Sequence, residues 1–161
     1  MVTARRQHGF TAAEIVVVLA IVGILAAIAV PSMSKMLTTQ AVRSAAYDLY
    51  ADLTFARSEA IARGTNITFV GASSDDFKKG WSVKAGTTVL RTQDARTSAI
   101  VFKGSQNSYT FDKTGRVIVG APASWGIRPK DTTDTQEYML RCILLDPSGR
   151  PRTQEGTSCG Y

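Results

Sequence analysis

The sequence predicts an α+β protein in which a long N-terminal helix packs on an antiparallel β-sheet or sandwich domain. An unbroken apolar run extends from Ile15 to Val30, and an apolar stripe at helical spacing continues beyond Pro31. After Gly64 the pattern changes to short strand-like runs separated by turns, and strands without intervening helices favour antiparallel pairing. A chain of 161 residues accommodates one domain plus a membrane-length helix.

The first half of the helix is long enough to cross a membrane. Phe10 to Val30 is 21 residues, close to the roughly 20 that a bilayer requires. A single acid, Glu14, opens the run, although a charge near mid-bilayer costs about 2.5–3.5 kcal/mol. We infer that this charge has a function that offsets its cost. Arg5 and Arg6 precede the run, so the positive-inside rule keeps the N-terminus cytoplasmic and exports the C-terminal body.

The segment Gly9-Phe10-Thr11 followed by Glu14 resembles the N-terminal signal of type IV pilins and pseudopilins. The resemblance implies that a prepilin peptidase cuts between Gly9 and Phe10 and that Phe10 is then N-methylated. It also implies that Glu14 pairs with the N-terminal amine of a neighbouring subunit during assembly. Such pairing is physically sound, because an unpaired ion in a low dielectric is costly.

This resemblance divides the chain into a leader (1–9), a transmembrane and assembly helix (10–31) and an exported globular domain (32–161). Two other interpretations stay open, an ordinary secretory signal and a plain membrane anchor. An acid at the head of the apolar run and a helical pattern that continues past Pro31 argue against the secretory signal.

The second half of the helix, 32–63, is predicted to be amphipathic. One stripe recurs at spacings of three and four residues: Val42, Ala45, Leu49, Leu53, Ala56 and Ala60. Its small members suggest a helix pressed closely onto a sheet. We expect Pro31 to kink or loosen the helix, and Gly64 to end it.

The β domain is expected over 65–161, with turn residues between its strands. The predicted strands are Asn66–Val70, Trp81–Lys84, Thr88–Arg91, Ala99–Lys103, Tyr109–Phe111, Arg116–Val119 and Tyr138–Leu145. The polar stretch between Gly120 and Glu137 is expected to be a long surface loop. Trp81 is expected in the core.

Two further stretches, Ala56-Arg57-Ser58-Glu59-Ala60-Ile61 and Gly80-Trp81-Ser82-Val83, resemble the GspH/FimT family of minor pilins and pseudopilins. With the N-terminal signal, this resemblance covers most of the chain. It implies a subunit of a pilus or pseudopilus filament.

Catalysis is not expected. The single histidine, His8, lies in the leader, so the mature protein has none for a triad, for acid–base chemistry or for a metal site. No glycine-rich loop with a GK[ST] ending is present to cradle phosphate. We therefore expect neither an enzyme nor a cofactor.

The two cysteines, Cys142 and Cys159, suit an exported body. A disulfide between them closes an 18-residue segment, worth about 3 kcal/mol in the loop-entropy model. Two free thiols are the alternative. Two cysteines alone do not make a four-ligand metal site, so no metal is expected.

Between the cysteines lies Gly149-Arg150-Pro151-Arg152, where two arginine forks suited to phosphate flank a proline. It resembles the G-R-x-R motif of FimT-type minor pilins, which bind DNA during natural transformation, and Gly149, Arg150 and Arg152 are the matching residues. From Ser32 onward, 17 Lys and Arg stand against 12 Asp and Glu, an excess that favours polyanions or anionic surfaces without singling out either. Arg141 and Lys130 are candidates to extend the same basic surface.

Three functions therefore stay open: a minor type IV pilin with a DNA-binding loop, a structural tip or priming pilin of the FimU type, and a GspH-like pseudopilin of a type II secretion system. The expected partners are other pilin subunits, the prepilin peptidase, the inner membrane and, for the first function, DNA. Before assembly the protein would sit in the inner membrane with a single pass, and afterwards in the filament.

Overall fold

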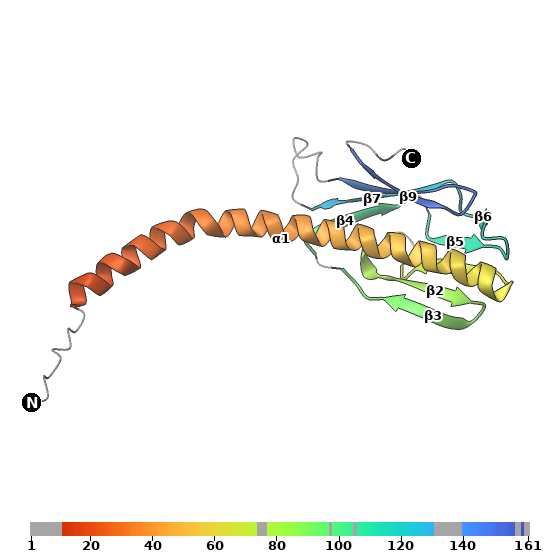
Figure 1. Cartoon of the computed structure of the whole chain (residues 1–161), viewed down its shortest axis with the longest axis horizontal. Helices are drawn as coiled ribbons and strands as arrows, with labels where there is room; N and C mark the ends of the chain where they lie inside the picture. Colours follow the sequence, from red (N-terminus) through yellow and green to blue (C-terminus); the bar gives the residue numbers. More distant parts are fainter. Residues whose placement is uncertain are drawn as a thin grey trace, which may run out of the picture. The chain divides into compact units, whose positions relative to one another are not determined.

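The computed structural model describes residues 11–73, 77–96, 98–104, 106–130, 140–156 and 159. The expected leader and the Gly9–Phe10 junction lie outside the described residues. The chain forms two compact units, one up to Leu37 and one from Thr38 onward. A single helix, α1 (Ala12–Arg63), contributes to both units and is followed by strands (Figure 1). The α+β class expected from the sequence is confirmed.

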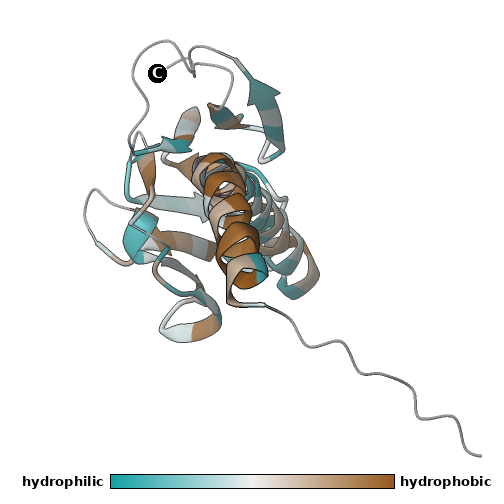
Figure 2. Cartoon of the chain, turned by 90° about the vertical axis from the view of Figure 1, so that its left-hand side faces the viewer, coloured by the Kyte–Doolittle hydropathy of each residue, from teal (hydrophilic) through white to brown (hydrophobic). Residues whose placement is uncertain are grey.

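In the first unit, α1 exposes nearly every apolar side chain that it carries. The large exposed residues include Ile15, Leu19, Leu25 and Ile28, and Figure 2 shows this part of the helix as almost continuously hydrophobic. By length and composition, the helix can cross a membrane. Pro31 lies inside α1, and the helix is not interrupted there.

In the second unit, α1 buries one face. The predicted stripe is fully buried: Val42, Ala45, Leu49, Leu53, Ala56 and Ala60 each have 0% exposure. The helix ends at Arg63, and Gly64 follows with φ = 62°, a left-handed conformation that glycine adopts without steric cost. Both predictions for this half are confirmed.

Two antiparallel sheets complete the second unit. Sheet A has the order β3-β2-β1-β5-β6, and sheet B has the order β4-β7-β8-β9. The strands of sheet A are β1 (Ile67–Gly71), β2 (Trp81–Ala85), β3 (Thr88–Gln93), β5 (Ser108–Phe111) and β6 (Val117–Val119). Those of sheet B are β4 (Ile100–Gly104), β7 (Ala123–Pro129), β8 (Arg141–Leu145) and β9 (Pro151–Glu155). A short 3₁₀ helix, η1 (Phe77–Lys79), precedes β2.

The expectation of a surface loop from Gly120 to Glu137 is wrong for its first part, because β7 occupies Ala123–Pro129. This strand lies between β4 and β8 and is buried at six of its seven positions. A strand buried on both faces loses the polar–apolar alternation that reveals a strand in sequence. Residues 131–137 of the expected loop lie outside the described residues.

A second strand, β9, was also not predicted. It begins with Pro151 and is mostly exposed. Proline is tolerated there because β9 is the edge strand of sheet B and Pro151 is its first residue.

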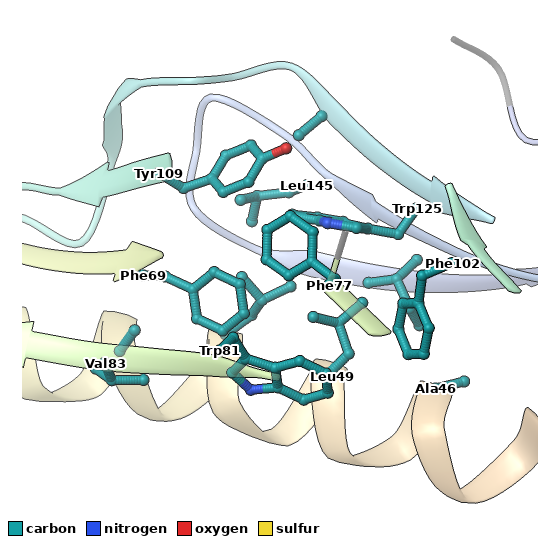
Figure 3. Close-up of a cluster of buried hydrophobic side chains, with 14 of the residues drawn as sticks. Ala46, Leu49, Phe69, Phe77, Trp81, Val83, Phe102, Tyr109, Trp125 and Leu145 are labelled. Carbon is teal, nitrogen blue, oxygen red and sulfur yellow. The ribbon is translucent and has the colours of Figure 1, made fainter. Parts of the chain in front are cut away.

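The core joins α1 to both sheets through a cluster of aromatic rings (Figure 3). Phe69 and Tyr109 come from sheet A, Trp125 from sheet B and Phe77 from η1. The Phe69 and Phe77 rings stack with their centroids 5.7 Å apart, and those of Tyr109 and Trp125 lie 4.6 Å apart. Contacts of this kind fix the two sheets against each other.

Trp81 is buried in the core as predicted, with 1% exposure. Its indole N–H donates to a carboxylate oxygen of Asp52 over 2.8 Å, and Arg91 donates to the other oxygen, also over 2.8 Å. Asp52 is itself buried, which its position off the apolar stripe did not predict. A buried carboxylate is tolerated here because both of its oxygens accept hydrogen bonds.

Candidate functional site

The candidate site is the turn between β8 and β9, which carries Gly149 and Arg150. The turn is closed by the Gly149 amide, which donates to the carbonyl of Asp146 over 2.9 Å. Gly149 has φ = 75°, in the left-handed region that favours glycine. A β-carbon at this position would collide with the carbonyl oxygen of Gly115. Gly149 therefore positions the turn by close backbone packing.

The partner of this turn is the β5–β6 turn, residues 112–116. The carboxylate of Asp112 accepts hydrogen bonds from the amide and hydroxyl of Thr114 and from the amide of Arg116. The hydroxyl of Thr114, followed by the Arg116 amide, lowers the pKa of Asp112 below its usual value. Asp112 is therefore ionised at neutral pH and holds its own turn closed.

Three contacts join the two turns to each other and to α1. The Val117 amide donates to the carbonyl of Pro147 over 3.0 Å. Arg57 on α1 donates through Nε to the carbonyl of Gly115 over 3.1 Å, and a β-carbon on Gly115 would strike the side chain of Ile61. The base of the Arg150 loop is thus held by residues from three distant parts of the sequence.

The two arginines of the motif differ in their surroundings. Arg150 is exposed, and no hydrogen bond or ion pair of its side chain is found among the described residues. Arg152 on β9 donates to Asp146 over 3.0 Å, but its side chain remains 64% exposed. Exposed pairs of this kind are worth at most about 1 kcal/mol, so Asp146 does not prevent Arg152 from meeting an anion.

Two more cations come close to this turn. Lys113 and Arg116 lie on the β5–β6 turn and are exposed. Because the Gly115 carbonyl packs directly on Gly149, these residues and Arg150 belong to neighbouring backbone segments. Sequence reasoning missed them, since more than 30 positions separate the two turns and no local pattern links them.

The other two proposed members of this surface are placed elsewhere. In sheet B, Arg141 pairs with Ile127 and Leu145 pairs with Ala123, so Arg141 lies at the opposite end of β8 from the turn. Lys130 follows the end of β7 that is nearest Arg141. The structure therefore separates Arg141 and Lys130 from Arg150.

The predicted disulfide is present between Cys142 and Cys159, with their Cα atoms 5.4 Å apart. Both cysteines are buried. The bridge ties the segment after β9 back to β8, which leaves the Arg150 loop inside a covalently closed segment. Among the described residues, no three His, Cys, Asp or Glu side chains gather as a metal site would require.

Glu14 has a local role that the sequence reading did not include. The amide and the hydroxyl of Thr11 each donate to its carboxylate over 2.8 Å, and the Glu14 amide approaches the Thr11 hydroxyl at 3.3 Å. This is a capping box, with Thr11 before the first helical residue and the acid three positions later. The signal was visible in the sequence as Thr11-Ala12-Ala13-Glu14.

An exposed apolar helical segment, followed by an amphipathic half that packs on antiparallel sheets, defines the class of pilin-like proteins. The chain belongs to the family described as "Type II transport protein GspH", which matches residues 45–149. Residues 4–30 match the prokaryotic N-terminal methylation motif. The protein is accordingly a minor type IV pilin or pseudopilin of the GspH/FimT type.

Solved structures share the fold of this chain. The type IV minor pilin FimU of Pseudomonas aeruginosa is 24% identical with a TM-score of 0.63, over 74% of this chain and 92% of that one. The minor pseudopilin EpsH of the Vibrio cholerae type 2 secretion system is 16% identical with a TM-score of 0.52, over 71% and 96%. At these identities the likeness concerns the fold. No curated protein sequence is significantly similar to the chain.

Proposed function

We propose that the chain is a minor pilin of a type IV pilus that contacts DNA through the β8–β9 turn. The observation that carries this proposal is a closely packed turn that presents Arg150 to solvent, followed on β9 by the exposed Arg152. Guanidinium forks suit phosphate oxygens, and because the backbone of the turn is held in place, little loop entropy is lost on binding. Contacts of this kind carry little sequence information, so binding should tolerate any DNA sequence.

The test is a gel-shift titration of duplex DNA with the full-length mature chain in detergent micelles. The double variant Arg150→Gln with Arg152→Gln keeps polarity and removes two charges, so it should lose measurable binding. A matched control, Lys79→Gln with Lys84→Gln, removes two charges from the β1–β2 region and should bind as the parent does. Equal binding by the parent and the Arg150/Arg152 variant would exclude this loop as the site.

Processing of the N-terminus is the second part of the proposal. The leader, residues 1–9, is removed between Gly9 and Phe10, and Phe10 becomes an N-methylated first residue. The match to the methylation motif over residues 4–30 supports it. The helix then holds the protein in the cytoplasmic membrane by a single pass until assembly. Mass spectrometry of the purified protein should show a chain that starts at methylated Phe10, and an intact leader would refute the proposal.

Glu14 is proposed to pair with the N-terminal amine of a neighbouring subunit, in addition to capping its own helix. The two roles separate by substitution. Glu14→Gln preserves a capping-box side chain but removes the charge, whereas Glu14→Ala removes both. If the charge drives assembly, both variants should insert in the membrane yet fail to enter filaments. Normal incorporation of Glu14→Gln would show that capping alone matters.

Two alternatives rest on the likeness to FimU and to EpsH. In one, the chain is a structural tip or priming pilin without DNA binding. In the other, it is a pseudopilin of a type II secretion system. Absence of DNA binding by the parent at low salt would favour these alternatives. Deletion of the gene then separates them, because a pilus subunit affects piliation and a pseudopilin affects protein secretion. All three functions are structural or binding roles without catalysis.

A further inference from the structure

A groove of about 360 Å3 lies in the second unit, between α1 and the edge of sheet B. It is distinct from the β8–β9 turn, because it adjoins the Arg141 end of β8. Residues from one helix and two strands form its walls: Arg43, Ala46, Tyr47, Tyr50, Arg141 and Thr153. Its volume falls in the range of sites that hold small organic groups.

The α1 wall of the groove presents two aromatic rings. Tyr47 is 72% exposed and Tyr50 is 38% exposed. By contrast, the aromatic side chains on the described β strands are all buried. The spacing of three residues between Tyr47 and Tyr50 places them on neighbouring positions of one helix face. Ala46, which is buried beside Tyr47, leaves room between the helix and the sheet. Exposed ring faces of this kind are platforms on which nucleic-acid bases stack.

The groove also carries an excess of positive charge. Arg43 is exposed, and Arg141 is largely buried and ion-paired with Glu155. Burial and, secondly, the nearby charge of Arg43 lower the pKa of Arg141 from its ordinary value. The guanidinium groups of Arg43 and Arg141 thus lie close enough to repel each other, and the carboxylate paired with Arg141 is itself 66% exposed. An anion in the groove would relieve the repulsion between Arg43 and Arg141.

We propose that this groove binds one nucleotide of single-stranded DNA, with the phosphate held by Arg43 and Arg141 and the base stacked on Tyr47, the more exposed of the two rings. The combination of two guanidinium forks and exposed aromatic rings matches a ligand that has both an anionic group and a flat ring. A duplex offers phosphates but no free base face, so the groove discriminates between the two forms.

This proposal rests on the proposed DNA-binding function, because it takes DNA as the ligand. It adds a second place at which the protein contacts that DNA. On edge strand β9, Arg152 lies three residues before Glu155, which is about 10 Å in an extended strand. Glu155 pairs with Arg141 in the groove. Because these two residues are an odd number of positions apart, their side chains point to opposite faces of sheet B, so a short oligonucleotide passes around the exposed β9 edge to reach both the β8–β9 turn and the groove.

The test uses the full-length mature chain in detergent micelles and a fluorescent oligothymidylate of about 12 nucleotides, within the site sizes of small single-strand-binding domains. Tyr47→Ala should weaken binding of the single strand about tenfold, as expected for loss of one stacking ring, and leave duplex binding unchanged. Tyr47→Phe retains the ring and should bind as the parent does. Unchanged single-strand affinity in Tyr47→Ala would overturn the proposal.

Arg43 gives a second, electrostatic readout. Arg43→Gln should reduce the log–log salt slope of single-strand binding by about 0.7, the value for one neutralised phosphate on a single strand. Lys84→Gln removes one charge from sheet A and should leave the slope unchanged. Equal slopes for the parent and Arg43→Gln would place the phosphate elsewhere.

Photocrosslinking locates the base directly. Bromodeoxyuridine in the oligonucleotide should couple to Tyr47 or Tyr50, and peptides that carry the crosslink are identified by mass spectrometry. Crosslinks confined to the β8–β9 turn would overturn the groove proposal and leave the function of that turn standing. If the parent binds neither form of DNA, the proposed function itself falls. If Tyr47→Ala blocks filament entry but not oligonucleotide binding, the groove is a contact between subunits and the nucleotide proposal is wrong.

Discussion

The two halves of α1 share one helix and differ in what surrounds them. Leu19 in the first half is 64% exposed, whereas Leu53 in the second half is fully buried. Helical backbone geometry is the same in both, so local propensity does not separate them. The first half is apolar around its circumference, so it requires lipid or other helices around it. The second half is amphipathic and buries its apolar face against the two sheets. Stability of the body therefore depends on one half, and membrane residence and assembly depend on the other.

The largest expected effect comes from a matched pair of leucine substitutions. Leu53→Ala should destabilise the body by about 2–5 kcal/mol, because it removes buried methyl groups and leaves a cavity. Leu19→Ala, at an exposed position, should leave body unfolding unchanged. Denaturant unfolding of the full-length chain in micelles, followed by near-UV circular dichroism of the buried tryptophans, measures both. A comparable loss in the two variants would break the distinction between the halves.

The disulfide should affect only the body. Replacing Cys142 and Cys159 with Ser is expected to cost about 3 kcal/mol of unfolding free energy, from the greater freedom of the unfolded segment. Membrane insertion should be unaffected, because the bridge lies within the second unit. The same unfolding experiment and a membrane-fractionation assay test the two statements. Failure of the double Ser variant to insert would contradict the second of them.

Enlarging a small residue should again separate the halves. Ala56→Leu introduces a bulky side chain at a fully buried position and should cost about 1–3 kcal/mol. Ala27→Leu, in the exposed first half, should not change the unfolding midpoint of the body. If Ala56→Leu is tolerated, α1 is less closely packed on the sheets than its burial indicates.

Gly149→Ala should cost about 1–3 kcal/mol and should also weaken DNA binding. The substitution forces a side chain into the left-handed region and against the Gly115 carbonyl. Gly86→Ala is the control, because Gly86 has φ = 58° but open space around it, so it reports backbone strain alone. The difference in unfolding free energy between the two variants isolates the contact between the turns. Equal losses would mean that this contact contributes nothing.

The elements that the sequence predicted are those with a repeating local pattern. The apolar stripe of α1 and the strands of sheet A carry such patterns, and the structure contains them. The β7 strand was missed because burial on both faces removes its alternation, and β9 because it is exposed and opens with Pro151. Both belong to sheet B, whose other two strands, β4 and β8, were predicted from the sequence.

The same division applies to the candidate site. The order Gly149-Arg150-Pro151-Arg152 was visible in the sequence, but the reason for the glycine was not. Glycine is required at position 149 because the carbonyl of Gly115, 34 positions earlier in the sequence, packs where a β-carbon would lie. The proximity of Lys113 and Arg116 has the same origin. Contacts between distant turns leave no local signature, so only the fold reveals them.

The most direct test of the DNA-binding proposal is the salt dependence of duplex affinity for the single variants Arg150→Gln and Arg152→Gln. If each arginine neutralises one phosphate, each variant should lower the log–log slope by about 0.9 relative to the parent. Lys84→Gln should leave the slope unchanged. Slopes equal to that of the parent in both arginine variants would contradict the account, because the turn would then make no contact with the DNA backbone.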